Sequence, residues 1–497
     1  MRTDKNSVLR TRRDFFRQAS CAAVGTLALT GTVRDLRLIQ SAMAQTGIPL
    51  GPNDYKALVC IFLSGGNDSN NWIVPTDSAT FDQYAQIRAN LALPQSSLLP
   101  LCQNGTSGAA YTDADGHTYG FHPACSGLQQ LFGEDKLAVL FNVGTLVRPT
   151  TRAQYTSSNS RFYQPPQLFS HSDQVTQWQT SIPDGPPTTG WGGRVADLLD
   201  ASANQNGSLS MSVSLNGTNT FEIGNLIAQY QVSTSGAVVA TGDQMGATGA
   251  RLAAMKNILN LSSSNLQRNA YAGVVKNAIA VGDLLNTAVS NSAATNFWTV
   301  PFPNTTLGNQ LKMIARLIEA RGNPASPVAG KFNMSRQIFF CGVGGYDTHT
   351  TQVLVNGTDQ PANANGAHYR LLDEVSACML AFQRAMEQIG AGDKVTTFTA
   401  SDFSRTFPTN SQGSDHGWGA HHVIMGGAVR GGRTYGKLPV FAVNGPDDTG
   451  LGRWIPTLAV DQYSATLARW FGVDPGKLAD VFPNLSRFSA SDLGFML

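Results

Sequence analysis

Aspartate and histidine residues follow three apolar runs of this chain where each run ends. The runs are 57–63, 337–343 and 394–399, and the residues that follow them are Asp68, Asp347 with His349, and Asp402. Because Asp347 and His349 are two positions apart after a double glycine, they could offer a carboxylate and an imidazole to the same ion. Such ligands hold divalent cations that lower the pKa of water or of a hydroxyl group. The pattern indicates a one- or two-metal hydrolytic site.

A fourth acidic group, Asp415 with His416, lies in a glycine-rich loop. Each group by itself has a simpler interpretation. An aspartate after glycine is commonly a turn residue that bonds to nearby backbone groups, and a single histidine is commonly a hydrogen-bonded structural residue. Both interpretations stay open for each residue, and the recurrence of the pattern is what favours a metal site.

These residues must be positioned by the apolar runs that precede them. Runs of this length, with a fourth at 137–143, are typical of strands covered on both faces, as in a parallel sheet. Helical patterns at 124–132 and 369–389 lie before two of them. This alternation predicts an α/β fold with a doubly wound, mostly parallel central sheet, in which ligands bind beyond the carboxyl ends of the strands.

The middle of the chain, residues 201–330, has a different pattern. Residues 208–215 alternate polar and apolar side chains, which predicts a half-exposed strand. Three helical stretches follow, at 249–261, 269–289 and 307–320. We interpret residues 201–330 as a helical cap or insertion on one α/β domain.

The N-terminus has the features of an export signal. Arg12-Arg13 precede an aromatic pair and a mild apolar run that ends at Leu29, as in a twin-arginine signal peptide. The run is only half the ~20 apolar residues needed to span a bilayer, which argues against a permanent membrane anchor. Ala42-Met43-Ala44 predicts cleavage before Gln45, so residues 1–44 form the signal and 45–497 the mature domain. We expect export by the twin-arginine translocase to the periplasm or beyond.

Two alternatives for the N-terminus remain. Cys21 could be a lipidation site, although the residue three positions before it is not apolar. The paired arginines could also begin an amphipathic helix by chance.

Composition narrows the class of protein. A formal net charge of +2 gives no electrostatic reason to propose nucleic acid as a partner, and 14% charged residues with 50 glycines indicate a loop-rich globular protein. Five cysteines follow the predicted cleavage site. We expect Cys60 and Cys341, inside apolar runs, to be buried thiols, whereas an oxidising compartment could join Cys102 to Cys125.

A set of motifs spread over the mature chain resembles the DUF1501 family of exported proteins. The motifs are Leu63 to Asn71 with Val74-Pro75, Phe169-Ser-His171, Gly190-Trp191, Gly345 to His349, Ser401 to Thr406, Gly413 to Gly419 and Gly426 to Gly432. The family looks like a distant branch of the alkaline phosphatase and sulfatase superfamily. The resemblance implies an α/β/α sandwich with one or two divalent ions (Zn, Mn, Mg or Ca) that hydrolyses phosphate or sulfate esters of a small molecule or a glycan.

The resemblance assigns metal-binding roles to individual residues. Asp68 matches the metal aspartate after the first strand, Asp347 and His349 match a pair at one metal, and Asp402 matches the late-strand aspartate of the other. His416, with Asp415 beside it, matches the final histidine. Superfamily enzymes usually have a histidine directly after the late-strand aspartate, where this chain has Phe403, so the second metal has one ligand fewer.

Candidates for the catalytic groups lie nearby. Superfamily members place a nucleophile at a helix N-terminus, where backbone N–H groups stabilise an anion; Ser170 fits this setting, Ser172 is second, and either could instead be an N-cap. His171 could bind the ester oxygens or orient its loop, and Arg405 could pair with the anion or brace Asp402. The leading hypothesis is a periplasmic metal-dependent hydrolase. The alternative, favoured by Phe403, is a degenerate relative that binds an anionic ligand or a partner without catalysis.

Overall fold

The structure is a computed structural model that describes residues 54–186, 188–204, 209–236, 250–261, single positions between 265 and 286, and residues 299–321, 332–355, 358–359 and 366–497. The predicted signal peptide 1–44, its cleavage site and Cys21 lie outside the described residues. No helix within these ranges is both long enough and apolar enough to cross a bilayer. Residues 52–497 form one compact unit.

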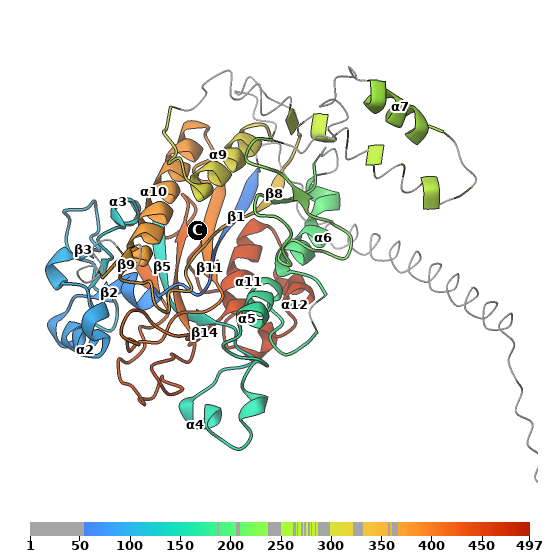
Figure 1. Ribbon diagram of the computed structural model, residues 1–497. Helices are drawn as coiled ribbons and strands as arrows, with labels where there is room; N and C mark the ends of the chain where they lie inside the picture. Colours follow the sequence, from blue (N-terminus) through green and yellow to red (C-terminus); the bar gives the residue numbers. More distant parts are fainter. Residues whose placement is uncertain are drawn as a thin grey trace, which may run out of the picture. The chain divides into compact units, whose positions relative to one another are not determined.

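Three long parallel strands form the centre of the main sheet (Figure 1). β1 (Lys56–Ser64) lies between β8 (Arg336–Gly344) and β11 (Val395–Ser401). Leu63 is in register with Val343 on one side and with Ser401 on the other. The carboxyl ends of all three strands therefore meet at one edge of the sheet.

Six other strands complete this sheet of nine described strands, in the order β13-β5-β12-β11-β1-β8-β6-β7 with β14 also paired to β5. Their bounds are β5 (Leu137–Gly144), β6 (Ser212–Ser214), β7 (Tyr230–Gln231), β12 (Ala420–Met425), β13 (Arg433–Tyr435) and β14 (Leu458–Ala459). Among these strands β12 alone runs antiparallel to its neighbours. A mostly parallel sheet covered by helices confirms the predicted α/β class.

Helices pack on both faces of the sheet. The first group is α3 (Ser126–Gly133), α9 (Thr306–Glu319) and α10 (Ala367–Gln388), and the second is α5 (His171–Thr180), α6 (Trp191–Ala203) and α11 (Val460–Phe471). Alternate residues of β1 serve the two faces. Val59 and Ile61 belong to the core under the first group, whereas Phe62 contacts Phe340 on the other side.

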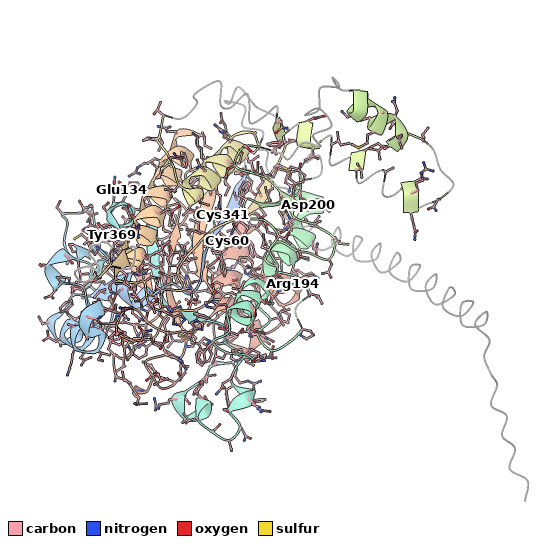
Figure 2. The ribbon with its side chains drawn as sticks, viewed as in Figure 1. Cys60, Glu134, Arg194, Asp200, Cys341 and Tyr369 are labelled. Carbon is pink, nitrogen blue, oxygen red and sulfur yellow. The ribbon has the colours of Figure 1, made fainter. Side chains whose placement is uncertain are left out.

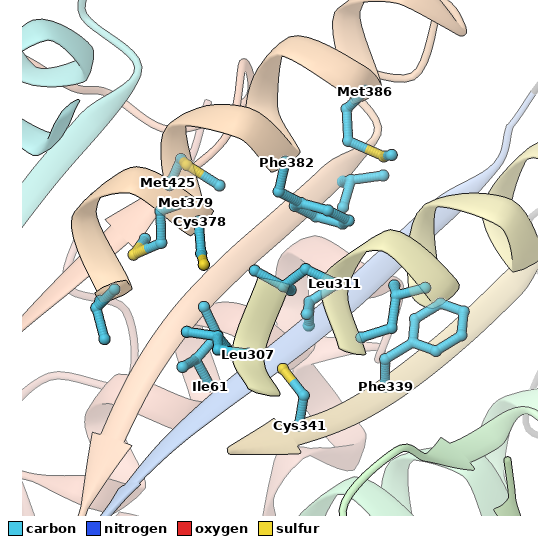
Figure 3. Close-up of a cluster of buried hydrophobic side chains, with 14 of the residues drawn as sticks. Ile61, Leu307, Leu311, Phe339, Cys341, Cys378, Met379, Phe382, Met386 and Met425 are labelled. Carbon is cyan, nitrogen blue, oxygen red and sulfur yellow. The ribbon is translucent and has the colours of Figure 1, made fainter. Parts of the chain in front are cut away.

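The sequence of α9 explains how it covers the sheet. Leu307, Leu311, Ile314 and Ile318 recur at helical spacing, and all four are fully buried. The side chain of Thr305 accepts a hydrogen bond from the Gly308 N–H and so caps the N-terminus. Figure 3 shows Leu307 and Leu311 among core side chains of the sheet and of α10.

The remaining elements surround this core. The helices are α2 (Ser78–Arg88), α4 (Arg152–Tyr155), α7 (Ala250–Leu259) and α12 (Leu478–Val481), and short 3-10 turns lie between several elements. A small sheet contains β2 (Ile73–Pro75), β4 (Tyr119–Phe121) and β3 (Leu99–Pro100), and a second one pairs β9 (Leu354–Val355) with β10 (Thr358–Asp359).

Part of the segment 201–330, expected to be an insertion, belongs to the central fold. β6 pairs in parallel with β8, and α9 packs on β8 and α10. β6 is buried at all three positions, where a half-exposed strand was expected, because its serines are small enough to fit under neighbouring elements. Ser214, for example, accepts a hydrogen bond from Asn219 Nδ2. The expected helix at 249–261 corresponds to α7, and the one at 269–289 lies largely outside the described residues.

All five cysteines of the described region are buried free thiols. Cys60 and Cys341 are buried thiols, as expected, and the Cys341 thiol donates to the Cys60 carbonyl of the neighbouring strand at 3.4 Å (Figure 2). Cys102 and Cys125, which an oxidising compartment could have joined, form no disulfide in the structure.

The packing of α9 leads to a stability prediction. Leu311→Ala removes a fully buried side chain, and we expect it to lower the free energy of unfolding by about 2–5 kcal/mol through lost burial and a residual cavity. Ile258→Ala, at a side chain 60% exposed on α7, is the control and should change it by less than about 0.5 kcal/mol. Urea denaturation followed by circular dichroism measures both, and equal effects would contradict the assignment of α9 to the core.

Candidate metal centre

The loops that follow the three central strands meet at the predicted edge of the sheet. The Gly65 N–H, after β1, donates to Asp402 Oδ1, after β11, at 3.1 Å. Gly65 has φ +114°, and a Cβ there would lie 2.5 Å from the backbone nitrogen of Asp347. Only glycine permits this approach, which brings the Asp347 loop of β8 against the turn after β1.

Three imidazoles surround one carboxylate oxygen at this edge. Asp347 Oδ1 lies 3.1 Å from His349 Nε2, 3.3 Å from His416 Nε2 and 3.5 Å from His171 Nε2. Atoms of His171, Asp347 and His416 that could bind a metal lie within 4.8 Å of one another. Asp347, His349 and His416 were expected to bind metal, and His171, expected to bind the ester oxygens or to orient its loop, lies in the same cluster.

The other ring nitrogen of each histidine is held by an oxygen. His171 Nδ1 lies 2.6 Å from Asp402 Oδ2, His349 Nδ1 lies 2.9 Å from Asp415 Oδ1, and His416 Nδ1 lies 2.8 Å from the Phe169 carbonyl. Ionised carboxylates and carbonyls only accept hydrogen bonds, so each Nδ1 carries the proton. A neutral ring then has its lone pair on Nε2, and the three lone pairs converge on Asp347. This is the arrangement in which oxygen partners orient metal-binding histidines.

The converging atoms suit a cation. In these tautomers His349 Nε2 and His416 Nε2, 3.0 Å apart, are both acceptors, as is the carboxylate oxygen between them. His171 Nε2 is buried and has no hydrogen-bond partner. Asp347, Asp402 and Asp415 together carry more negative charge than Arg405 offsets. A divalent ion satisfies all of these atoms at once, so the residues fit a metal site.

The carboxylates and imidazoles respond differently to this environment. The hydrogen bond with Asp402 raises the pKa of His171, whereas burial lowers the pKa of His416. Burial by itself raises the pKa of Asp347, but the hydrogen bond and charge of Arg405, together with His349 and His171, outweigh this and hold the pKa below its ordinary value. Asp347 therefore stays ionised.

Arg405 is a buried brace of the cluster. Its Nη1 donates to Asp347 Oδ1 at 2.6 Å and to the Gly65 carbonyl at 3.2 Å, and its Nε donates to the Ser414 carbonyl at 3.1 Å. The guanidinium thus binds the turn after β1, the loop after β8 and the Ser414 loop. Of the two roles expected, it braces a carboxylate, and that carboxylate is Asp347 where Asp402 was expected.

Phe403 forms an apolar wall of the cluster. Its ring centroid lies 4.8 Å from that of His171 and 4.7 Å from that of His416, and the side chain is fully buried. The residue after Asp402 thus contributes apolar packing against two of the imidazoles.

Ser170 directly precedes the helix that carries His171. It occupies the N-cap position of α5, but its side chain makes no capping hydrogen bond. Its hydroxyl donates to Asp173 Oδ2 at 2.6 Å, and the Ser172 hydroxyl lies 3.2 Å away. The N-cap role expected for the Ser170 side chain is not realised, and its hydroxyl has a carboxylate acceptor.

Asp68 lies outside the cluster, although it was expected to bind a metal. It is fully buried, forms an ion pair with Arg88 of α2, and accepts a hydrogen bond from Gln352. Burial raises its pKa, but Arg88 and the other groups around it lower the pKa to below its ordinary value. Both of these contacts are made by Oδ2, whereas Oδ1 is buried without a hydrogen-bond partner.

Three of the six predicted metal-binding residues have other contacts in the folded protein: Asp402 and Asp415 orient imidazoles, and Asp68 pairs with Arg88. Asp347 lies at the centre of the cluster and contacts all three histidines. Sequence reasoning missed Arg88, Gln352 and the Phe169 carbonyl. An arginine in a helix and a main-chain oxygen carry no motif, so the sequence held no signal for them.

The protein thus has an α/β fold with a cluster of histidine and aspartate residues at the carboxyl edge of its sheet. The chain belongs to the DUF1501 family, described as proteins of unknown function, whose model matches residues 55–480. No curated protein matches it. It is similar to a solved structure described as Ps i-CgsB in complex with k-i-k-neocarrahexaose, at 8% identity and a TM-score of 0.32, over 88% of this chain and 75% of that one.

The Asp68 and Arg88 pair leads to a second stability prediction. Arg88→Ala leaves a buried carboxylate without its partner, and we expect a loss of about 3–5 kcal/mol in the free energy of unfolding at pH 7. Because the pKa of Asp68 is lowered by folding, the pair stabilises above the carboxyl group's ordinary pKa and this contribution is lost as the pH falls. The difference between variant and wild type should therefore shrink below about pH 4.

The control is Arg384→Ala, which breaks a partly exposed ion pair with Glu134 and should cost less than about 1 kcal/mol. Chemical denaturation at several pH values measures the set. A difference that is the same at pH 3 and pH 7 would contradict an ionised, paired Asp68.

Proposed function

We propose that this protein is a metal-dependent hydrolase of phosphate or sulfate esters. The observation that carries the proposal is the convergence of three imidazole Nε2 atoms on Asp347 Oδ1, with each Nδ1 held by an oxygen. The geometry favours a single divalent ion (Zn, Mn, Mg or Ca) held by His171, His349, His416 and Asp347. Asp68, expected to bind a metal, pairs with Arg88, and Asp402, expected at the second metal, contacts His171 Nδ1.

The bound ion would polarise the ester's anionic oxygens and offset the charge that develops during the reaction. The remaining steps belong to the chain. Ser170, at the N-terminus of α5, is the proposed nucleophile, and Asp173 accepts its proton through the 2.6 Å hydrogen bond. As the Ser170 oxygen bonds to phosphorus or sulfur, the bond to the ester's alcohol oxygen breaks, and that oxygen takes up a proton as it leaves. Water then cleaves the serine ester, which restores Ser170 and releases phosphate or sulfate. The positive end of α5 stabilises an anion beside Ser170. Arg405 keeps Asp347 ionised and in place.

The wider assignment follows the same resemblance. We propose an alkaline phosphatase-like α/β/α arrangement and export through the twin-arginine translocase to the periplasm or beyond. A protein that must acquire a metal before it crosses the membrane has reason to be exported folded.

Phe403 supports a second candidate function. Its buried ring takes the position of a metal-binding histidine of the superfamily, so a degenerate member that binds an anionic ligand without turnover is the alternative. Metal content followed by activity on aryl esters separates the two. A purified protein that stays inactive on both aryl phosphates and aryl sulfates after addition of Zn, Mn or Ca would overturn the hydrolase proposal.

Metal binding is the first test. We expect the full chain to bind about one Zn or Mn ion by calorimetry and elemental analysis. His416→Ala should abolish binding, and Asp415→Ala, which removes the acceptor of His349 Nδ1, should weaken it about 10–100-fold. His117→Ala, at a histidine paired with Asp77 outside the cluster, should leave affinity unchanged. Wild-type affinity in His416→Ala would place the ion elsewhere.

The nucleophile is tested separately. With 4-nitrophenyl phosphate and 4-nitrophenyl sulfate as substrates, we expect Ser170→Ala to lower kcat roughly 10³-fold or more while metal content stays unchanged. Ser172→Ala, which leaves the Ser170 to Asp173 hydrogen bond in place, is the control. A Ser170→Ala variant with the wild-type rate would mean that another group attacks the ester.

A further inference from the structure

A large cavity adjoins the metal centre. Its volume is about 890 Å³, and its walls come from the chain between β5 and α5 together with Asp184. Figure 1 shows α4, part of this stretch, on a loop that extends from the body near α5 and β14. The volume is large enough for a ligand with one or two rings, and much larger than an inorganic phosphate or sulfate ion needs.

One residue belongs to both the cavity and the metal centre. Phe169 lines the cavity, its carbonyl accepts from His416 Nδ1 at 2.8 Å, and it directly precedes Ser170. Its φ of +75° is unusual for an aromatic residue and sets the direction in which the chain enters α5. The Arg453 guanidinium, 4.3 Å from the ring centroid, holds the Phe169 ring in place. A ligand in the cavity therefore lies beside the proposed nucleophile.

The charges of the cavity wall are unbalanced. Within the part of the chain that the structure describes, no carboxylate pairs with Arg148 or Arg161. The Nε atom of Arg148 is buried and has no hydrogen-bond partner. The acidic residue of the wall, Asp184, is already paired with Arg487 at 2.5 Å. The wall thus offers two uncompensated positive charges and a free, buried donor.

Aromatic surface lies next to these charges. The guanidinium of Arg148 stacks 3.4 Å from the centroid of the Phe162 ring, whose side chain is 56% exposed, and this contact fixes the direction of its donors. Phe162, Tyr155 and Phe169 supply flat apolar faces, and Gln164 supplies an amide. Ring faces beside guanidinium donors suit a ring that carries a negatively charged group.

We infer that this cavity binds the alcohol part of the substrate, and that the substrate carries a second anionic group that pairs with Arg148 and Arg161. This inference rests on the proposed function for the reacting end of the molecule, which lies at Ser170 and the metal centre. The substrate class is therefore a ring-bearing ester, such as a multiply sulfated or phosphorylated sugar, with at least two negative charges. Simple aryl esters carry no second anionic group, so they leave Arg148 and Arg161 without a partner.

Binding to the cavity can be measured apart from hydrolysis. The probes are naphthalene-1,5-disulfonate and naphthalene-1-sulfonate, ring anions without an ester bond, titrated into the full chain by calorimetry in the presence of EDTA. We expect the disulfonate to bind at least about tenfold more tightly, and its affinity to fall as salt is added, because partly exposed charges are screened. The same titration with sucrose octasulfate, compared with sucrose, tests saccharide probes.

Variants of the wall complete the test. Arg148→Gln and Arg161→Gln should each weaken disulfonate binding about tenfold, and Phe162→Ala, which keeps both guanidinium groups, should weaken both naphthalene probes. Lys437→Gln removes one positive charge from a side chain 74% exposed elsewhere and should change neither affinity. Equal affinities for the two sulfonates, or arginine variants that bind as the wild type does, would overturn the inference.

The two proposals fail in different ways. If no ester is hydrolysed but the disulfonate preference and its loss in Arg148→Gln are found, the cavity site stands and the hydrolase proposal falls. If aryl esters are hydrolysed but KM for multiply charged esters does not change in Arg148→Gln, the hydrolase stands and the cavity site falls.

Discussion

The parallel pairing of β11, β1 and β8 is the constraint on which the site depends. Because Leu63 is in register with both Val343 and Ser401, three loops that are far apart in the sequence begin at the same level of one sheet edge. The strands themselves are held by apolar faces covered on both sides, so the edge is rigid. Loops that start from a rigid edge can hold imidazoles within a few tenths of an ångström of a shared position.

The charged side chains of the loops form two groups, one around the imidazoles and one around Asp68. Asp402, Asp415 and the Phe169 carbonyl turn the three imidazoles, while Arg405 ties Asp347 to the turn after β1. Behind them lies a separate buried ion pair, Asp68 with Arg88, which is connected through Gln352 to the Ser414 hydroxyl. Since Ser414 also accepts from Arg405, this inner pair supports the loop that carries Asp415 and His416. The buried Asp68 and Arg88 pair thus supports the positions of the loops, whereas the three imidazoles and Asp347 are the proposed metal ligands.

The metal centre and the cavity are connected through one peptide. Phe169 lines the cavity, and its carbonyl accepts from His416 Nδ1, so one residue belongs to both the cavity wall and the cluster. The two sites also differ in charge. The cluster has an excess of carboxylates that suits a cation, and the cavity has unpaired guanidinium groups that suit an anion. The substrate that we propose would bridge them, with its reacting group at the cluster and its other charge at Arg148.

The α/β class, the three central strands and the places of five residues at strand ends or in glycine-rich loops could all be predicted from the sequence. These residues are Asp347, His349, Asp402, Asp415 and His416. Apolar runs, glycine pairs and acidic residues are local signals, and each could be recognised without its neighbours. β6 was harder, because buried serines give the same alternation as a half-exposed strand.

Which oxygens and nitrogens face one another depends on the tertiary structure. Asp68 and Asp402 look alike in the sequence, as acidic residues that follow an apolar run. The fold places Arg88, 20 positions away, against Asp68 and places His171, 231 positions away, against Asp402. A carboxylate's role as a metal ligand, an ion-pair partner or an orienting acceptor depends on which donor packs beside it. That contact is long-range and leaves no periodic trace in the chain.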